Sequence, residues 1–234
     1  MCFSAGASFA GAAVISAIGI AAVREVHKPS QKLFATIPLF FAFQQVAEGV
    51  VWLSLKQGGD HSLQMAGAYI FLLMALVIWP MMIPMAVLRM EENIKKRKVM
   101  KWIFGAGLIL SLYYAVCLVN LNVYPRINQF HIQYINDFPK MLRHIAFAIY
   151  GFVTIAPLFI SSVKRVSIFG ILIIISFVIT GILYKEYLTS VWCFFASLIS
   201  AVIYIIVRES QEEFSLYNQR FIKLLSDRTH WRNR

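Results

Sequence analysis

Residues 33–55 read LFATIPLFFAFQQVAEGVVWLSL, a run long and apolar enough to cross the roughly 30 Å hydrocarbon core of a bilayer as one helix. Glu48 is the single acidic residue in this run, and the chain's other Asp and Glu residues fall in predicted loops or in the tail. An ionisable group in hydrocarbon costs roughly 2.5–3.5 kcal/mol on insertion scales, so it usually faces a bundle interior or a wet cavity. We therefore predict that Glu48 points toward other helices and take it as the first candidate functional residue.

The composition of the whole chain is that of an integral membrane protein. Hydrophobic residues make up 59% of the 234 residues, and the mean hydropathy is +0.69. Soluble domains are only about 45–50% apolar. We predict an all-α, seven-transmembrane-helix bundle that forms one domain over residues 1–208. Its spans lie near residues 3–23, 33–55, 63–88, 102–121, 142–162, 166–184 and 187–207.

The distribution of positive charge predicts the orientation of this bundle. The net charge is +11, but the basic residues fall in short loops and not in one aromatic-interleaved patch, which argues against nucleic-acid binding. Of the 22 Lys and Arg residues, 17 lie in the loops and the tail on one side, and five (Lys56, Arg126, Lys140, Arg143 and Lys185) lie on the other. By the positive-inside rule, the amino terminus is outside and the carboxyl terminus is cytoplasmic.

Two segments outside the spans have patterns of their own. The tail, residues 209–234, spaces Phe214, Tyr217 and Phe221 by three and four among basic residues, which predicts an amphipathic helix in the cytoplasmic headgroup region. The longest outward loop, about residues 122–141, is rich in aromatic residues. We expect it to lie on the membrane surface or to cover a pocket.

Several polar side chains are predicted to lie at the same depth as Glu48, in the outer third of the bundle. Gln44, Gln45, Glu48 and Trp52 are spaced by three or four and share one helix face. Counting from the helix ends also places Cys2, Ser4, Cys117, His144 and Cys193 in the outer third. Three roles for the carboxyl group of Glu48 stay open. It is a structural hydrogen-bonding group, a ligand-binding or proton-coupling site, or a general acid or base.

The three cysteines leave further alternatives open. If Cys2, Cys117, Cys193, His144 and Glu48 converge, they suit a thiophilic metal such as zinc or copper, although no CxxC or HExxH element supports this. Cys2 and Cys193 are instead a candidate disulfide on the oxidising side. Each cysteine is otherwise a small buried hydrophobe. The sequence itself identifies no cofactor.

Two motifs carry a resemblance to a known group of proteins. The opening MCFSAGASF and the segment IPLFFAFQQVAEGVVW at residues 37–52 resemble an uncharacterised family of bacterial integral membrane proteins that begin MCFSA and carry a QQ-x-x-EG-x-x-W element. The likeness is concentrated in about the first 55 residues. It implies a multi-pass protein of the bacterial inner membrane. The matching positions are Cys2, Phe3, Ser4, Ala5, Gln44, Gln45, Glu48, Gly49 and Trp52.

The functional hypothesis is an outward-facing polar pocket centred on Glu48 that binds or moves a small solute or ion. We expect Gln44, Gln45, Trp52, Cys2, Ser4 and His144 to line it. One alternative is a membrane-embedded enzyme that uses Glu48 as general acid or base, with or without a metal. A second alternative is a structural or partner-binding bundle. Apart from the lipid bilayer, the sequence identifies no partner and no oligomeric state.

Overall fold

The computed structural model describes residues 4–58, 60–128, 131–163, 165–183 and 188–209. Its elements, in chain order, are α1 (Ala5–Arg24), η1 (Pro29–Gln31), α2 (Lys32–Ala35), α3 (Ile37–Gln57), α4 (His61–Leu72), η2 (Leu73–Ile78), α5 (Trp79–Met90), α6 (Ile94–Asn120), β1 (Val123–Asn128), β2 (His131–Asn136), α7 (Lys140–Ile160), α8 (Val166–Leu183) and α9 (Leu188–Ile199). After a turn at Ser200 the last helix continues over residues 201–209.

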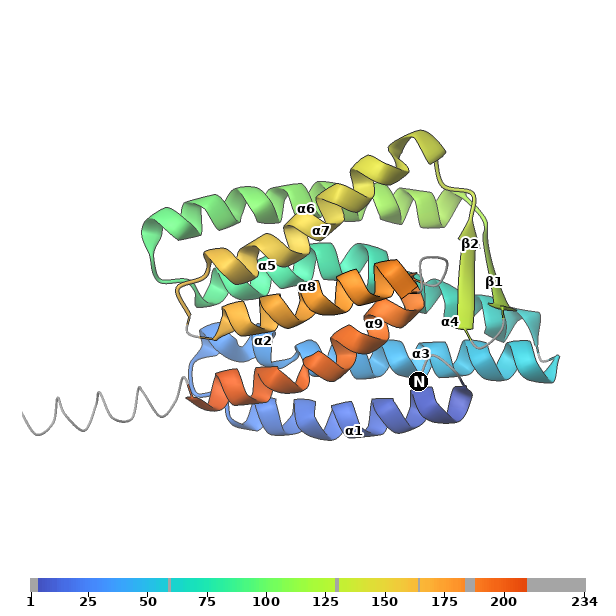
Figure 1. The fold of residues 1–234 in the computed structure, drawn as a ribbon, viewed down its shortest axis with the longest axis horizontal. Helices are drawn as coiled ribbons and strands as arrows, with labels where there is room; N and C mark the ends of the chain where they lie inside the picture. The colour runs from blue at the N-terminus through green and yellow to red at the C-terminus, as the bar shows by residue number, and fades with distance from the viewer. Residues whose placement is uncertain (1–3, 59, 129–130, 164, 184–187, 210–234) are drawn as a thin grey trace, which may run out of the picture.

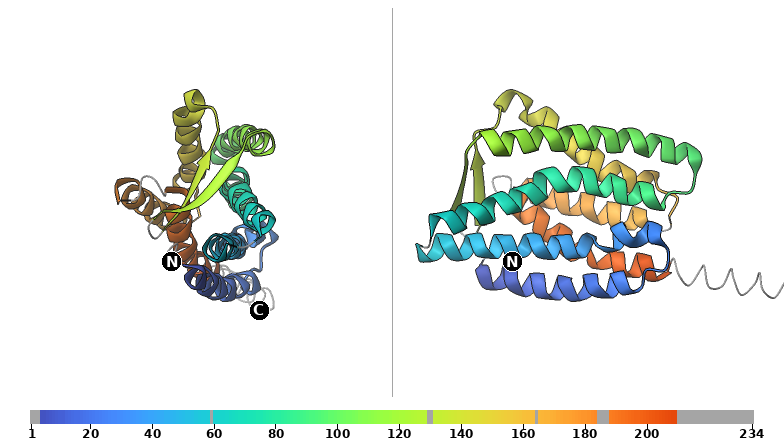
Figure 2. Two further views of the ribbon diagram at one scale, coloured as in Figure 1. Left: turned by 90° about the vertical axis from the view of Figure 1, so that its right-hand side faces the viewer. Right: turned by 180° about the vertical axis from the view of Figure 1, so that it is seen from behind.

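Seven helices are long and apolar enough to cross a membrane, which confirms the predicted number of spans. The third is continuous through α4, η2 and α5, and the seventh covers Thr189–Glu209. They form one up-and-down helix bundle, and the hairpin β1–β2 lies across one end of it (Figures 1 and 2). The seven spans indicate a multi-pass membrane protein. The predicted amphipathic tail, residues 210–234, lies outside the described residues.

The chain is mostly helical, and the predicted outward loop contains one antiparallel β-hairpin that the sequence did not predict. Strands β1 and β2 pair from Val123 with Asn136 to Asn128 with His131. β-Branched and aromatic residues favour strands here. Each strand has only six residues, and a pattern of that length is too short to identify from the sequence. Val123 and Ile132 are fully buried, so the hairpin is packed onto the bundle and not free in solvent.

Helix α3 lies at the centre of the first half of the chain, packed against both α1 and α4. The close approach of α1 requires a glycine on α3. A Cβ atom on Gly49 would lie 2.8 Å from the ring of Phe9, a distance that real Cβ atoms essentially never show. The glycine that follows Glu48 in the motif therefore admits an aromatic ring from α1.

The third span is bent where α4 passes through η2 into α5 (Figure 2), near Pro80 and Pro84. Pro84 has no N–H to donate to the carbonyl of Pro80, and the six residues of η2 just before Pro80 are wound as a π-helix. Two side chains satisfy carbonyls that this winding exposes: Tyr150 donates to Ala75 O and Ser111 donates to Val77 O, both at 2.7 Å. The bend is thus held by hydrogen bonds from α6 and α7.

The carbonyl of Pro80 also sets how close α6 can come to α5. A Cβ atom on Gly107 would lie only 2.1 Å from Pro80 O, which is backbone and cannot move aside. We expect Gly107→Ala to separate α5 from α6 and lower the free energy of unfolding by about 1–3 kcal/mol, the usual cost of overpacking. Thermal unfolding in detergent measures this loss.

The control is Gly105→Ala on the same helix, where an added Cβ meets nothing within 4 Å. It should be neutral or raise stability by up to about 1 kcal/mol, because alanine is the better helix former. Equal melting temperatures for the two variants would contradict the proposed close approach.

A buried acid holds the end of the bundle opposite the hairpin. Glu91 is only 1% exposed although it lies in the short turn between α5 and α6. Its Oε1 accepts from the backbone N–H of Asn93 at 2.9 Å, and its Oε2 accepts from that of Ser162 at 2.7 Å. Glu91 therefore joins this turn to the residues that follow α7. The sequence reasoning missed it, because a loop position gives no signal of burial.

The ionisation of Glu91 is linked to stability. Burial raises the pKa of the carboxyl group, but the hydrogen bonds from Ser162 and Asn93, aided by Lys96, outweigh burial and leave the pKa below its ordinary value. A lowered folded-state pKa means that the stabilisation is present at neutral pH and is lost as the pH falls through that pKa. Glu91→Gln, which cannot accept with both atoms, should cost about 1–3 kcal/mol at pH 7.

Melting temperatures of the wild type and Glu91→Gln should converge on acidification from neutral pH. The neighbouring Glu92→Gln is the matched control, because the Glu92 side chain is 90% exposed and has only a 3.7 Å ion pair with Lys28. Glu92→Gln should change stability little at any pH. A constant difference between wild type and Glu91→Gln at all pH values would contradict the linkage.

Candidate functional site

Glu48 lies inside the bundle, 0% exposed, and is hydrogen-bonded across helices. The hydroxyl of Ser190, at the start of α9, donates to Glu48 Oε1. Ser190 is itself 1% exposed, so this pair is closed to bulk solvent. The predicted inward orientation of Glu48 thus agrees with the structure, and its partner comes from a helix that begins 140 residues later.

Gln44, one turn before Glu48, has hydrogen-bond partners on two other helices, α5 and α9. Trp79 Nε1 of α5 donates to Gln44 Oε1 at 2.8 Å, and Gln44 Nε2 donates to Cys193 Sγ of α9 at 3.3 Å. An indole N–H can only donate, so it determines which end of the amide faces Trp79 and leaves the amide N–H for the sulfur atom. Trp79 also stacks on Phe41, with ring centroids 3.9 Å apart. We call Glu48, Gln44, Ser190, Cys193 and Trp79 the α3–α9 network.

A cavity of about 300 Å³ lies beneath the β-hairpin. Tyr134 and Asn136 of β2 belong to its lining, and Tyr134 stacks on Phe71 of α4 with ring centroids 4.8 Å apart, which ties the hairpin to the bundle. The described residues that line it are Leu72, Ala75, Leu76, Tyr113, Tyr114, Tyr134, Asn136, Phe138, Pro139, Arg143, Ala146, Phe147, Tyr150, Thr189, Trp192 and Cys193. Their surface is mixed, with tyrosine hydroxyls, an amide and a guanidinium among apolar groups.

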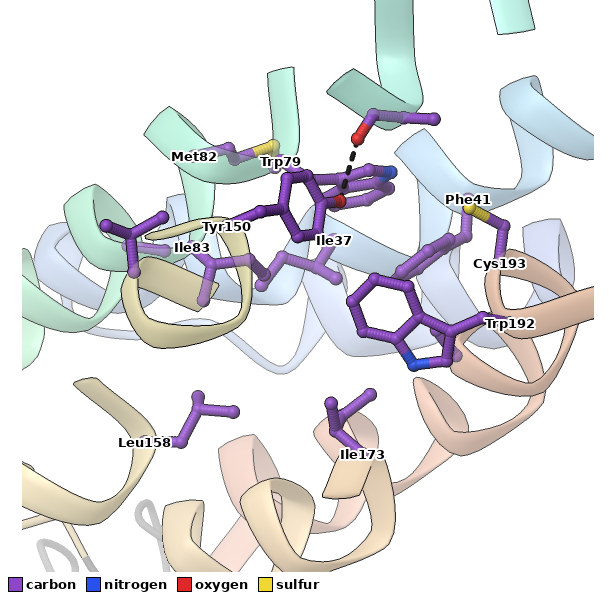
Figure 3. Packing of buried hydrophobic residues seen from close by; sticks show 14 of the residues in the cluster. Ile37, Phe41, Trp79, Met82, Ile83, Tyr150, Leu158, Ile173, Trp192 and Cys193 are labelled. Carbon is purple, nitrogen blue, oxygen red and sulfur yellow. Dashed lines mark hydrogen bonds between the residues drawn. The ribbon is translucent and has the colours of Figure 1, made fainter. Parts of the chain in front are cut away.

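A second, smaller cavity of about 40 Å³ lies deeper in the bundle and is almost wholly apolar. Figure 3 shows Tyr150 and Trp192 on one side of this space, with Leu158 and Ile173 across from them. Tyr150, Trp192 and Cys193 line both cavities, and the rings of Tyr150 and Trp192 meet edge to face at 5.6 Å. These three residues form the wall between the two spaces.

Cys193 is the residue that joins the cavity to the α3–α9 network. It lines both cavities and accepts the hydrogen bond from Gln44. Thr189, Trp192 and Cys193 are spaced by three and four, so one face of α9 forms cavity wall, while the adjacent Ser190 holds Glu48. Neither Glu48 nor Gln44 is among the described lining residues. The cavity is therefore beside Glu48 and is not centred on it.

The other predicted site residues are dispersed. Trp52 is buried in a small cluster with Val51, Ala68 and Ile132, where it supports the hairpin. Gln45 is 1% exposed, and its Nε2 has no hydrogen-bond partner among the residues described. Ser4 caps the start of α1, with Ala7 N–H donating to its hydroxyl at 3.3 Å. Cys2 lies outside the described residues.

His144 is exposed on α7 and is not among the described residues of either cavity lining, so the structure does not bring it to Glu48. Cys117 is buried on α6, and both Cys117 and Cys193 are free thiols. Within the described ranges, no three His, Cys, Asp or Glu side chains come together as a metal site. These residues were predicted to lie at the same depth in the bundle, but they lie on helix faces that point in different directions.

Sequence reasoning missed Ser190, Trp79 and Tyr150. Serine and tyrosine in an apolar run are too common to signal a site, and a tryptophan in the middle of a span is as readily a packing residue. One signal was available: Ser190, Ser197 and Ser200 are small polar residues in the last span, and all three are buried. Small polar residues mark the packed side of a membrane helix.

The chain belongs to a family of unknown function (DUF6629), whose model matches residues 1–216. No curated protein and no solved structure matches the chain. The matched region includes every helix and strand described above, and with them the α3–α9 network and the cavity beneath the hairpin.

The hydrogen bond between Ser190 and Glu48 predicts a measurable coupling. In a double-mutant cycle of Glu48→Leu and Ser190→Ala, each of which removes one partner of the hydrogen bond, we expect a coupling free energy of about 0.6–1.7 kcal/mol, the range for side-chain hydrogen bonds in a membrane bundle. Unfolding in mixed micelles gives the four stabilities.

The control cycle pairs Glu48→Leu with Ser54→Ala. Ser54 is also buried on α3, but it lies six residues away, about 9 Å along the helix. This second cycle should be additive. Additivity in both cycles would show that Ser190 and Glu48 do not interact.

Proposed function

We propose that this protein binds a small ligand, a solute or an ion, in the cavity beneath the β-hairpin, and that the buried Glu48 acts on this site through α9. The observation that carries the proposal is the shared role of α9, which lines the cavity with Thr189, Trp192 and Cys193 and holds Glu48 with Ser190. Glu48 is then a positioning residue and does not touch the ligand.

The size and chemistry of the cavity support binding. Its volume of about 300 Å³ is at the lower end of the range for small-molecule pockets. Tyr113, Tyr114, Asn136, Arg143 and Thr189 provide hydrogen-bonding groups around an otherwise apolar wall. A few polar groups in an apolar pocket are the usual means of orienting a ligand.

Glu48 links this site to proton binding. Protonation of the carboxyl group would change what it can accept from Ser190, and Ser190 lies next to the cavity-lining Thr189 on α9. Ligand binding and protonation would thus act on the same helix, as proton-coupled movement of a solute requires. The π-helical segment η2, whose Ala75 also lines the cavity, is a second element suited to adjust, since π-bulges occur often at functional sites.

The enzyme alternative receives less support from this geometry. A general acid or base has to reach its substrate within hydrogen-bond distance. Glu48 and Ser190 are closed to solvent, and neither is among the described residues that line the two cavities. A purely structural bundle remains the outcome if no ligand is bound.

We further propose that the hairpin end faces outward from a bacterial inner membrane. Four basic residues with described positions lie at this end (Lys56, Arg126, Lys140 and Arg143), whereas the turns at the opposite end carry most of the others. The positive-inside rule then places the cavity on the periplasmic side.

A ligand panel tests the binding proposal. Thermal shifts of the purified protein across ions, amino acids, organic acids and phosphate esters should reveal a stabilising ligand, because binding to the folded state raises the melting temperature. Thr189→Phe, which fills the cavity, should abolish the shift. Ile182→Phe is the control, since Ile182 lies on α8 at 73% exposure and away from the cavity.

Glu48→Gln, which imitates the protonated carboxyl group, should keep binding but remove its dependence on pH. In proteoliposomes, a proton gradient should alter ligand flux in the wild type and not in Glu48→Gln. Retention of the full ligand shift in Thr189→Phe would locate binding elsewhere. Identical flux in wild type and Glu48→Gln would remove Glu48 from the mechanism.

A further inference from the structure

A groove on the outside of the bundle adjoins the same cavity. It lies between α6 and α7, has a volume of about 350 Å³, and its described lining is wholly apolar apart from the edge of Tyr113. Ile109 and Ile145 in this groove are 72% and 58% exposed. In a bilayer, side chains exposed on the flank of a seven-helix bundle face lipid acyl chains and not water.

The groove and the cavity are adjacent, because Tyr113 and Ala146 line both. Tyr113 is partly exposed and Ala146 is 6% exposed, and both residues lie at the boundary between the two spaces. Helix α7 runs obliquely to its neighbours at the hairpin end of the bundle (Figures 1 and 2). The site thus consists of the apolar groove on the lipid side and the partly polar cavity beneath the hairpin.

A small hydrophilic solute makes no favourable contact with the apolar groove, whereas an acyl chain packs against the groove along its whole length. The groove residues on α7 run from Leu142 to Ile149, seven residues or roughly 10 Å at 1.5 Å per residue. That length matches about eight methylene groups of an extended chain. An amphiphile is therefore the ligand class that uses both parts of the site.

The lining of the cavity indicates the charge of the headgroup. Among the lining residues that the structure describes, Arg143 is the one charged side chain, and no described carboxylate lines the cavity beside it. A guanidinium binds phosphate with two parallel N–H donors, and Tyr113 and Tyr114 line the same cavity. This charge is complementary to a negatively charged phosphate headgroup.

We propose that the ligand of this site is an anionic phospholipid from the surrounding bilayer leaflet. Its headgroup occupies the cavity near Arg143, and one acyl chain lies in the groove between α6 and α7. The lipid enters sideways from the membrane. This inference rests on the proposed ligand-binding function of the cavity and specifies the class of ligand.

Lipid competition tests the inference. The full-length protein, in nanodiscs that contain phosphatidylglycerol and phosphatidylcholine with identical chains, is analysed by native mass spectrometry for the lipid that stays bound. We expect a preference of roughly tenfold for phosphatidylglycerol, set by the charge-assisted contact with Arg143. Arg143→Gln should reduce the ratio to about that of the bulk membrane, since the charge is gone.

Two matched controls separate a built site from general lipid attraction. Arg126→Gln removes an equally exposed positive charge of the hairpin that donates to Gln133 at 2.8 Å and is not among the cavity-lining residues. It should leave the preference unchanged. Ile109→Ser places a hydroxyl in the groove and should weaken retention of phosphatidylglycerol, whereas Ile182→Ser, at 73% exposure on α8, should not.

The outcomes distinguish the two proposals. Equal retention of both lipids, or an unchanged preference in Arg143→Gln, overturns the lipid inference. If glycerol phosphate or another soluble member of the panel stabilises the protein while phosphatidylglycerol is not retained, the cavity binds a soluble ligand and only the lipid inference fails. If neither soluble ligands nor lipids bind, both proposals fail. Because Arg143 and Ile109 are exposed, their variants are expected to fold.

Discussion

The burial of polar groups on α3 is the constraint on which the rest of the bundle depends. Glu48 and Gln44 are both 0% exposed, one turn apart, in a segment that crosses the membrane. Unpaired, they would carry the full cost of desolvation, and within hydrocarbon no water is available to reduce it. Ser190, Cys193 and Trp79 supply the partners. The position of α9 against α3, and the contact of Trp79 on α5 with Gln44, meet that need.

The second constraint is the bent third span, which gives the cavity part of its shape. Prolines remove backbone donors, and the π-helical segment η2 presents carbonyls that Tyr150 and Ser111 satisfy from neighbouring helices. Tyr150, held by Ala75 O, forms part of the wall between the two cavities. The same hydrogen bond therefore stabilises the bend and positions a residue of the candidate site.

The hairpin completes the site from a distant part of the sequence. Tyr134 stacks on Phe71, and Ile132 packs with Trp52 on α3, so the strands are held at both the α4 and the α3 side. Beneath the strands, Arg143 and several tyrosines line the cavity, which adjoins the apolar groove between α6 and α7. A site that is polar at one end and lipid-facing at the other suits a molecule of the same mixed character.

The sequence by itself determined the class, the seven spans and the inward orientation of Glu48, because each depends on local composition, hydrocarbon thickness or the cost of an ionisable group in hydrocarbon. Only the tertiary structure decided which polar groups meet. Depth along a helix can be counted from the sequence, so Cys193 and His144 were both placed near Glu48 in height. The direction in which a side chain points depends on the rotation of each helix, which is set by packing against all the others. That rotation brought Cys193 to Gln44, left His144 exposed, and put the cavity beside Glu48 instead of around it.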